Sequence, residues 1–168
     1  MEYLECWVMK SKKLPKMSEE EILQLIKKQS LCRIAFSEES YPYISPFQYV
    51  VIDDAMYFHF TDYGKKMSFL RKDTPVCVEI EMYSPDFSKF AFVILQGNLK
   101  VVDDPSEASK ALRRFVVEGK KNFSENFLQV HGFPLGSKWE DLTEKPSIIV
   151  KLDKVVRKTG LKSENYDN

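Results

Sequence analysis

The residues best suited to binding chemistry lie in one segment, residues 57–70, which reads YFHFTDYGKKMSFL. Gly64, Lys65 and Lys66 stand where a short helix is expected to begin. A helix N-terminus carries a partial positive charge and free backbone N–H groups, so two cations there are locally unfavourable. An anion such as phosphate removes this conflict, because the N–H donors, the helix dipole and both lysines then favour binding. The alternative, in which both lysines are simply solvated, stays open.

Aromatic side chains surround these lysines in the sequence: Tyr57, Phe58, His59, Phe60 and Tyr63. A phosphate alone needs no aromatic neighbours, whereas a ring attached to that phosphate needs flat apolar walls. Because successive side chains of a strand face opposite ways, alternate members of this group are expected in a barrel core instead. His59 is the one candidate for proton transfer, since imidazole titrates near neutrality; a histidine packed in the barrel is the alternative.

The strand that precedes this segment carries a proline. Residues 43–52 read YISPFQYVVI, and Pro46 falls inside this β-rich run. Proline donates no hydrogen bond to a ladder, so this stretch is predicted to be an edge, a bulge or a place where something else approaches. A ring bound beside the lysines would meet the backbone there.

These residues need a framework of strands joined by hairpins. Ser18 and Glu21 form a capping box before an apolar stripe, which predicts a helix that ends near residues 29–30. A second helix is predicted to begin at Asp104, and a short one at residues 64–72. Alternating patterns predict six strands, at residues 31–36, 43–52, 55–61, 76–82, 89–102 and 147–156. Because hairpins dominate, the predicted class is mainly β, an antiparallel barrel of about six strands with two or three short peripheral helices.

One domain is expected for residues 1–168, since domains typically have roughly 50–250 residues. Residues 1–17 are predicted to form an irregular or loosely attached arm. Residues 123–145 contain glycine and proline with few periodic signals, so a long loop or short helical turns are expected. The tail TGLKSENYDN, residues 159–168, is polar and is expected to fray, and a bend is expected at Gly97.

The composition argues against several classes of protein. The 168 residues include 25 basic and 25 acidic side chains, so the formal net charge is zero. Binding to nucleic acid or to an anionic membrane through an overall positive charge is therefore not expected. The start of the chain shows no signal peptide, and no apolar run approaches the roughly 20 residues of a membrane-spanning helix. Three cysteines without a pairing pattern complete the prediction of a cytoplasmic protein.

Metal and nucleophile chemistry have little basis in the sequence. His59 and His131 are the only histidines, and neither HExxH nor a CxxC pair occurs, so no metal site is expected. No GxSxG motif supports a catalytic triad. Neither GxGxxG nor a Walker loop is present, so the two commonest glycine-rich nucleotide sites are not expected.

Six pieces of the sequence occur in an order typical of one family. They are SEEEIL at residues 18–23, RIAF at 33–36, PYISPFQY at 42–49, YFH and GKK within 57–66, PVCV at 75–78, and GNLKVVDDPSE at 97–107. Over roughly residues 18–118 the chain resembles the flavin-binding split-barrel proteins related to pyridoxamine 5′-phosphate oxidase. The likeness is greatest to the branch that includes the nitroimidazole-resistance reductases.

The resemblance implies a split β-barrel that binds FMN, usually at the interface of a homodimer. It assigns the FMN phosphate to Lys66, with Lys65 assisting. Arg33 either reaches the cofactor or is a solvated strand arginine. The resemblance also implies two groups along the flavin, namely Ser45, Pro46 and Phe47 beside the isoalloxazine ring, and His59, Phe60 and Thr61 beside the ring or the ribityl chain.

The chain also departs from the pattern of that family. Phe60 occupies a position that is often small or polar in relatives. The C-terminal Arg and His pattern of genuine pyridoxamine phosphate oxidases is absent, so vitamin B6 oxidation is not expected. Because the family has members that bind haem or a deazaflavin, these remain alternatives to FMN.

The predicted function is an FMN-dependent oxidoreductase acting on a small molecule. The alternatives are a flavin- or haem-binding protein or sensor without turnover, and a structural domain with an empty barrel. Trp139 and His131, in the segment 123–145, are expected either to close over the flavin or to pack on the barrel or a partner subunit.

Overall fold

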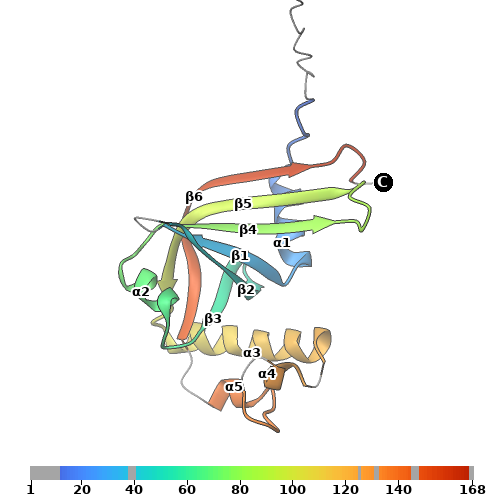
Figure 1. The fold of residues 1–168 in the computed structure, drawn as a ribbon. Coiled ribbons are helices and arrows are strands. Elements are labelled where there is room, and N and C mark those ends of the chain that lie inside the picture. The colour runs from blue at the N-terminus through green and yellow to red at the C-terminus, as the bar shows by residue number, and fades with distance from the viewer. Residues whose placement is uncertain (1–11, 38–40, 125, 131–132, 145–147, 167–168) are drawn as a thin grey trace, which may run out of the picture.

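The computed structural model describes residues 12–37, 41–124, 126–130, 133–144 and 148–166. Six antiparallel strands form a closed barrel in the order β1-β2-β3-β6-β5-β4 (Figure 1). The strands are β1 (Leu31–Phe36), β2 (Tyr43–Ile52), β3 (Ala55–Phe60), β4 (Val76–Tyr83), β5 (Phe90–Val101) and β6 (Ile148–Lys162). The helices in this part of the chain are α1 (Glu19–Lys28), α2 (Lys65–Arg71), α3 (Pro105–Asn122), α4 (Phe127–Val130) and α5 (Asp141–Glu144). The predicted mainly β class and six-stranded antiparallel barrel are confirmed.

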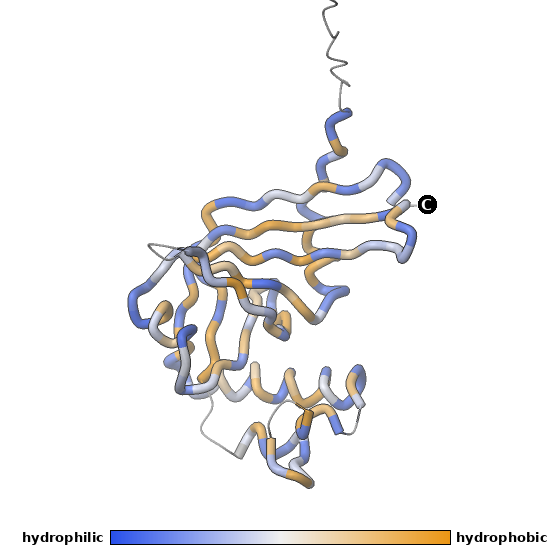
Figure 2. The backbone as a smooth tube through the Cα atoms, viewed as in Figure 1, coloured by the Kyte–Doolittle hydropathy of each residue, from blue (hydrophilic) through white to orange (hydrophobic). Residues whose placement is uncertain are grey.

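The barrel core follows from the alternation of side chains along each strand. Ile34, Phe58, Val78, Val93 and Val150 come from five different strands and have no exposed surface. In Figure 2 the strands carry long apolar stretches, whereas α3 alternates between apolar and polar residues. Such a helix buries one face, and α3 lies with α4 and α5 at one end of the barrel (Figure 1).

Local signals fix both long helices where the sequence predicted them. The Ser18 hydroxyl accepts a hydrogen bond from the Glu21 backbone N–H (3.2 Å), and the Glu21 carboxylate accepts one from the Ser18 N–H (2.6 Å). At α3, the Asp104 carboxylate accepts from the N–H groups of the first turn, and Pro105 stands at the first helical position. Such caps satisfy N–H groups that have no partner within the helix.

The β2–β3 hairpin brings two of the predicted site segments together. Asp53 (φ 49°) and Asp54 (φ 64°) are both left-handed, as the twist of a two-residue hairpin turn requires. Residues 43–48 of β2 pair with β1, and the ladder to β3 begins only at Tyr49. Pro46 therefore lies in a stretch that is paired on one side, which confirms the expected local edge.

The bend expected at Gly97 is confirmed as an irregularity in the β5–β6 ladder, between Gln96 and Asn98. A Cβ at Gly97 would lie 2.7 Å from the Asp153 carbonyl oxygen of β6. Only glycine allows the two backbones to approach this closely.

The expectation that residues 159–168 fray is wrong for the part that the structure describes. β6 runs to Lys162, and residues 159–162 pair with residues 91–94 of β5. Lys158 and Lys162 form ion pairs with Glu19 and Glu21 of α1, so the charges that made the tail look solvated have partners. Residues 167–168 lie outside the described residues.

The N-terminal arm is also attached where it is described. The Met17 N–H donates to the Gly160 carbonyl (2.9 Å), and the Lys162 N–H donates to the Pro15 carbonyl (3.1 Å). Residues 1–11 lie outside the described residues. Residues 123–145 contain α4 and α5, in line with the predicted short helical turns, and α3 is longer than the short helices expected. No helix among the described residues is long and apolar enough to cross a membrane.

Candidate functional site

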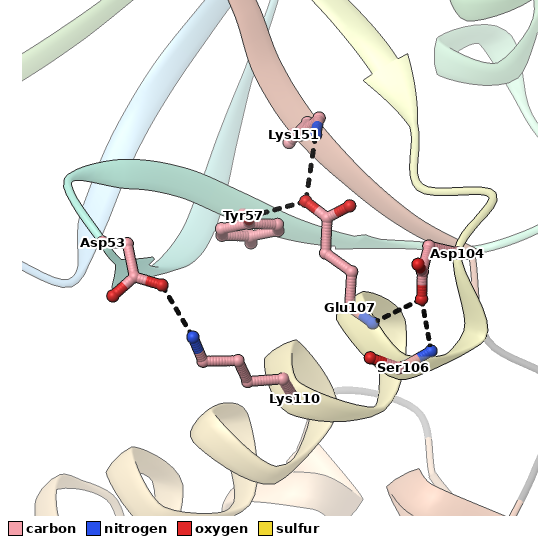
Figure 3. A network of polar contacts seen from close by, with 7 residues as sticks. All are labelled: Asp53, Tyr57, Asp104, Ser106, Glu107, Lys110 and Lys151. Atoms are coloured by element: carbon pink, nitrogen blue, oxygen red, sulfur yellow. Dashed lines mark hydrogen bonds and ion pairs between the residues drawn. The ribbon is translucent and has the colours of Figure 1, made fainter.

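A polar network anchors α3 against β3 and β6 and so places the side chains that α3 offers to the site (Figure 3). The Tyr57 hydroxyl donates to the Glu107 carboxylate (2.8 Å), and the Lys151 ammonium donates to the same oxygen (2.9 Å). These contacts, that of Lys151 first, lower the pKa of Glu107. Burial, followed by the bond to Glu107, raises the pKa of Tyr57 to about 12, so its hydroxyl remains a donor at neutral pH.

A second contact ties α3 to the β2–β3 turn. The Lys110 ammonium donates to the Asp53 carboxylate at 2.6 Å (Figure 3). Both side chains are more than half exposed, so this pair adds little stability by itself. Together the two contacts hold α3 alongside β2 and β3.

A cavity of about 350 Å³ lies between the barrel and these helices. Five of the nine residues proposed from the sequence line it: Pro46, Phe47, His59, Thr61 and Lys66. Its other walls are mainly apolar. They include Leu112 and Phe115 of α3, Phe127 and Leu128 of α4, Leu142 of α5, and Phe133 and Trp139 between them.

Lys66 supplies the positive charge of this cavity. Its ammonium lies 5.1 Å from the centre of the Phe47 ring and 5.7 Å from that of Phe60. Burial lowers the pKa of the Lys66 ammonium below its ordinary value. In the part of the chain that the structure describes, no carboxylate lies within ion-pair distance of Lys66. A partly buried cation that contacts aromatic rings and has no paired carboxylate among the described residues is stabilised by an anionic ligand.

His59 lies in the same wall, one strand over from Pro46. Its imidazole is 6.4 Å from the Phe115 ring, in an edge-on arrangement. Burial first, and then the Lys66 charge, lower the pKa of His59, so the imidazole is neutral at pH 7. A neutral imidazole can donate one hydrogen bond and accept another, but it holds no spare proton.

Lys65 points elsewhere, although it precedes Lys66 in the chain. Its ammonium lies 5.2 Å from the Tyr43 ring and 5.9 Å from the Phe69 ring, and it does not line the cavity. Gly64, before it, has φ 91°, a left-handed conformation that glycine tolerates. The predicted short helix is confirmed, but its two lysines diverge.

Three other predicted residues also lie outside the cavity lining. Phe60 is 1% exposed inside the barrel and stacks on Phe47, with ring centres 4.8 Å apart. Ser45 pairs with the buried Ile34 and so faces the barrel interior. Arg33 faces outward, where its guanidinium contacts the carboxylates of Glu79 (3.3 Å) and Glu81 (2.5 Å). Those contacts, led by Glu81, raise the pKa of Arg33.

Trp139 is a wall residue for which the sequence left two roles open. Its indole covers Gly119 of α3, where an added Cβ would come within 2.6 Å of three indole carbons. It also packs against Phe127 and Phe123, with ring centres 5.3 and 6.2 Å away. Trp139 therefore packs within the helical layer and lines the cavity as well. A glycine inside a helix was the sequence signal for this contact, whereas His131 lies outside the described residues.

Metal ligands do not gather at this site. Among the described residues no three His, Cys, Asp or Glu side chains come close enough together to hold a metal ion. A larger cavity, of about 680 Å³, lies between α1, β2 and α3, but it contains neither His59 nor Lys66. We therefore place the candidate cofactor site in the smaller cavity.

The sequence model of the family described as pyridoxamine 5′-phosphate oxidase matches residues 18–131. The chain belongs to this family. The match covers β1 to β5, α2 and α3, and so includes every strand residue and lysine of the cavity. No curated protein sequence matches closely enough to count as a relative.

Solved structures similar to this family member share its fold. An FAD-binding protein from Mesorhizobium loti has a TM-score of 0.64 at 17% identity, covering 89% of this chain and 96% of its own. A protein from Bacteroides thetaiotaomicron proposed to confer 5-nitroimidazole antibiotic resistance has a TM-score of 0.62 at 16% identity. The match covers 89% of this chain and 87% of that protein. An FAD and heme binding protein from Mycobacterium smegmatis has a TM-score of 0.62 at 14% identity. The match covers 90% of this chain and 74% of that protein. At such identities the likeness concerns the fold.

Proposed function

We propose that the chain binds FMN in the smaller cavity and uses it as an oxidoreductase acting on a small molecule. The observation that carries this proposal is Lys66, a partly buried cation with no carboxylate partner in the described part of the chain, set in an aromatic wall. A phosphate monoester is the anion that this arrangement fits, and an aromatic ring attached to it fits the apolar walls. The family match and the flavin-binding proteins of the same fold support the choice of a flavin.

The side chains divide the binding between them. Lys66 holds the phosphate, while Phe47 and Pro46 border the ring on the side where β2 lacks a ladder partner. His59 and Thr61 offer hydrogen bonds to the polar groups of the flavin or its ribityl chain. FMN, when bound, supplies the electron transfer, and the protein orients it and shields it from water.

The neutral His59 bears on catalysis. Of the residues that line the cavity, only His59 and Lys66 titrate in the range that matters for acid–base chemistry, and His59 is kept uncharged by burial. Any proton needed during turnover therefore comes from Lys66, from solvent or from the substrate. This feature also supports the second candidate, a flavin-binding protein without turnover.

Three measurements test these functions in order. The visible spectrum of the purified protein, and a titration of FMN into flavin-free protein, test binding; a colourless protein that also ignores added FMN contradicts the proposal. Oxidation of NADH or NADPH with quinone or nitroaromatic acceptors then separates the oxidoreductase from the binding protein.

A homodimer with the cofactor at its interface is part of the proposal. Leu31 and Ile44 are 51% and 60% exposed, and they share one outer face of β1 and β2 with Pro46. Exposed apolar residues beside a cofactor cavity suit a partner subunit. Ile44→Glu is expected to yield a monomer with weakened FMN binding in analytical ultracentrifugation and titration.

A cytoplasmic location is also proposed, since Cys32 and Cys77 are free thiols.

A further inference from the structure

The larger cavity adjoins the smaller one. Its volume of about 680 Å³ falls in the range of small-molecule sites, which is roughly 300–1,000 Å³. It lies between the end of α1, the outer face of β2 and the C-terminal half of α3. Gln48, Phe115 and Trp139 line both cavities, so a molecule in the larger cavity shares a wall with the proposed flavin.

Three stacked aromatic side chains form the partition. Phe127 lines the smaller cavity, Phe123 lines the larger, and Trp139 lines both. The ring centres of Phe123 and Phe127 are 4.5 Å apart, and Trp139 stacks against each. Gly119 beneath the indole lets Trp139 sit against the α3 backbone. The larger cavity therefore has an aromatic wall where it adjoins the smaller one.

Charged side chains also line the larger cavity, three of them basic and three acidic. Three ion pairs form at or beside this cavity, namely Lys27 with Asp54, Arg114 with Glu118, and Lys110 with Asp53. All of these except Lys110 line the cavity. Lys28 also lines it, and within the described residues Lys28 has no ion-pair partner. The charges that line the cavity balance, and Lys28 on the α1 wall is the cation that a negative group would meet there.

We propose that the larger cavity is the substrate chamber and that it takes a planar aromatic anion. The ring lies against Phe123 and Trp139, and the acidic group lies toward Lys28. This inference rests on the proposed function, because the substrate exchanges electrons with the flavin. Gln48, Phe115 and Trp139 line both cavities, so a single layer of side chains separates the two molecules and electrons cross that layer.

The test uses FMN-loaded protein and two probes, 2-naphthoate and the uncharged 2-naphthalenemethanol, each titrated by calorimetry. Asn122 and its neighbour Lys121 are both exposed, but only Asn122 lines the larger cavity. Asn122→Trp fills the chamber, and Lys121→Trp is the matched control. Ser30→Trp fills the chamber from the opposite wall and replaces Asn122→Trp if that variant does not fold.

Asn122→Trp is expected to weaken 2-naphthoate binding at least about tenfold and to leave FMN affinity unchanged, while Lys121→Trp changes neither. Lys28→Gln is expected to weaken 2-naphthoate about two- to fivefold, as for an exposed ion contact, without affecting the alcohol. Unchanged 2-naphthoate binding in the filled variant overturns the proposal, and so does a wild type that ignores this probe. A filled variant that loses FMN or FAD instead assigns the larger cavity to the cofactor. A wild-type protein that binds no flavin overturns the proposed function itself, which the FMN titration alone reveals.

Discussion

Replacing Lys66 by alanine tests the proposed phosphate site most directly. The Lys66 ammonium is partly buried over Phe47 and Phe60 and has no carboxylate partner among the described residues. A charge-assisted contact to phosphate contributes roughly 1.5–3 kcal/mol, which corresponds to about tenfold to a hundredfold in affinity. Lys66→Ala should therefore weaken FMN binding by that factor, measured by quenching of flavin fluorescence.

The fold of this variant should persist. Burial disfavours the charged form of Lys66. No carboxylate of the described residues is paired with it, so its removal leaves no opposite charge without a partner in the flavin-free protein. The free energy of unfolding without flavin is expected to change little. Urea denaturation of both proteins provides that control.

Two comparisons make the result specific. Riboflavin has the same ring but no phosphate, so Lys66→Ala should leave its affinity within about twofold of wild type. Lys65→Ala is the matched variant, because the Lys65 ammonium lies over Tyr43 and Phe69 and not in the cavity. It should weaken FMN by no more than about threefold. Equal losses in both variants, or an unchanged titration curve for Lys66→Ala, would refute the reasoning.

Three further predictions concern stability. The pKa of His59 is lower in the folded than in the unfolded chain, so the unfolded chain binds more protons and stability should fall as pH drops below about 6.5. His59→Phe should reduce this loss of stability at low pH. The same pH dependence of the melting temperature in wild type and variant between about pH 5 and 7.5 would contradict the role given to His59. Gly97→Ala should cost about 1–3 kcal/mol in urea denaturation, because its Cβ meets a β6 carbonyl at 2.7 Å, and a neutral result would show that the bulge relaxes. Tyr57→Phe should lower the free energy of unfolding by about 0.5–1.5 kcal/mol, because it removes the hydrogen bond to Glu107. In a double-mutant cycle the effect of Tyr57→Phe should be smaller in the Glu107→Gln background, and an equal effect in both backgrounds contradicts the prediction.

Much of the fold was predictable because its signals are local. The capping box at Ser18, the Asp53–Asp54 turn and the cap at Asp104 act within a few residues of themselves, and each lies where the sequence placed it. The end of β6 was missed because its lysines depend on glutamates of α1, about 140 positions earlier. No local pattern reports a partner so distant in the sequence.

The candidate site divides in the same way. Alternation along β3 places Phe58 and Phe60 inside the barrel and His59 outside, so a family resemblance that assigned Phe60 to the flavin conflicted with a simple period-2 rule. Lys65 and Lys66 diverge because adjacent residues of a helix point in different directions. The wall made by Phe115, Phe127 and Trp139 depends on how α3 docks, which is a tertiary arrangement.

The place of β6 in the barrel has a consequence for how the protein is made. β6 lies between β3 and β5 and follows the other five barrel strands in the sequence, so the sheet has two unpaired edges until residues 148–162 have left the ribosome. Exposed strand edges are templates for pairing with other chains. Until β6 has been synthesised, the edges of β3 and β5 can therefore pair with other chains, and closure of the barrel must follow translation of residues 148–162.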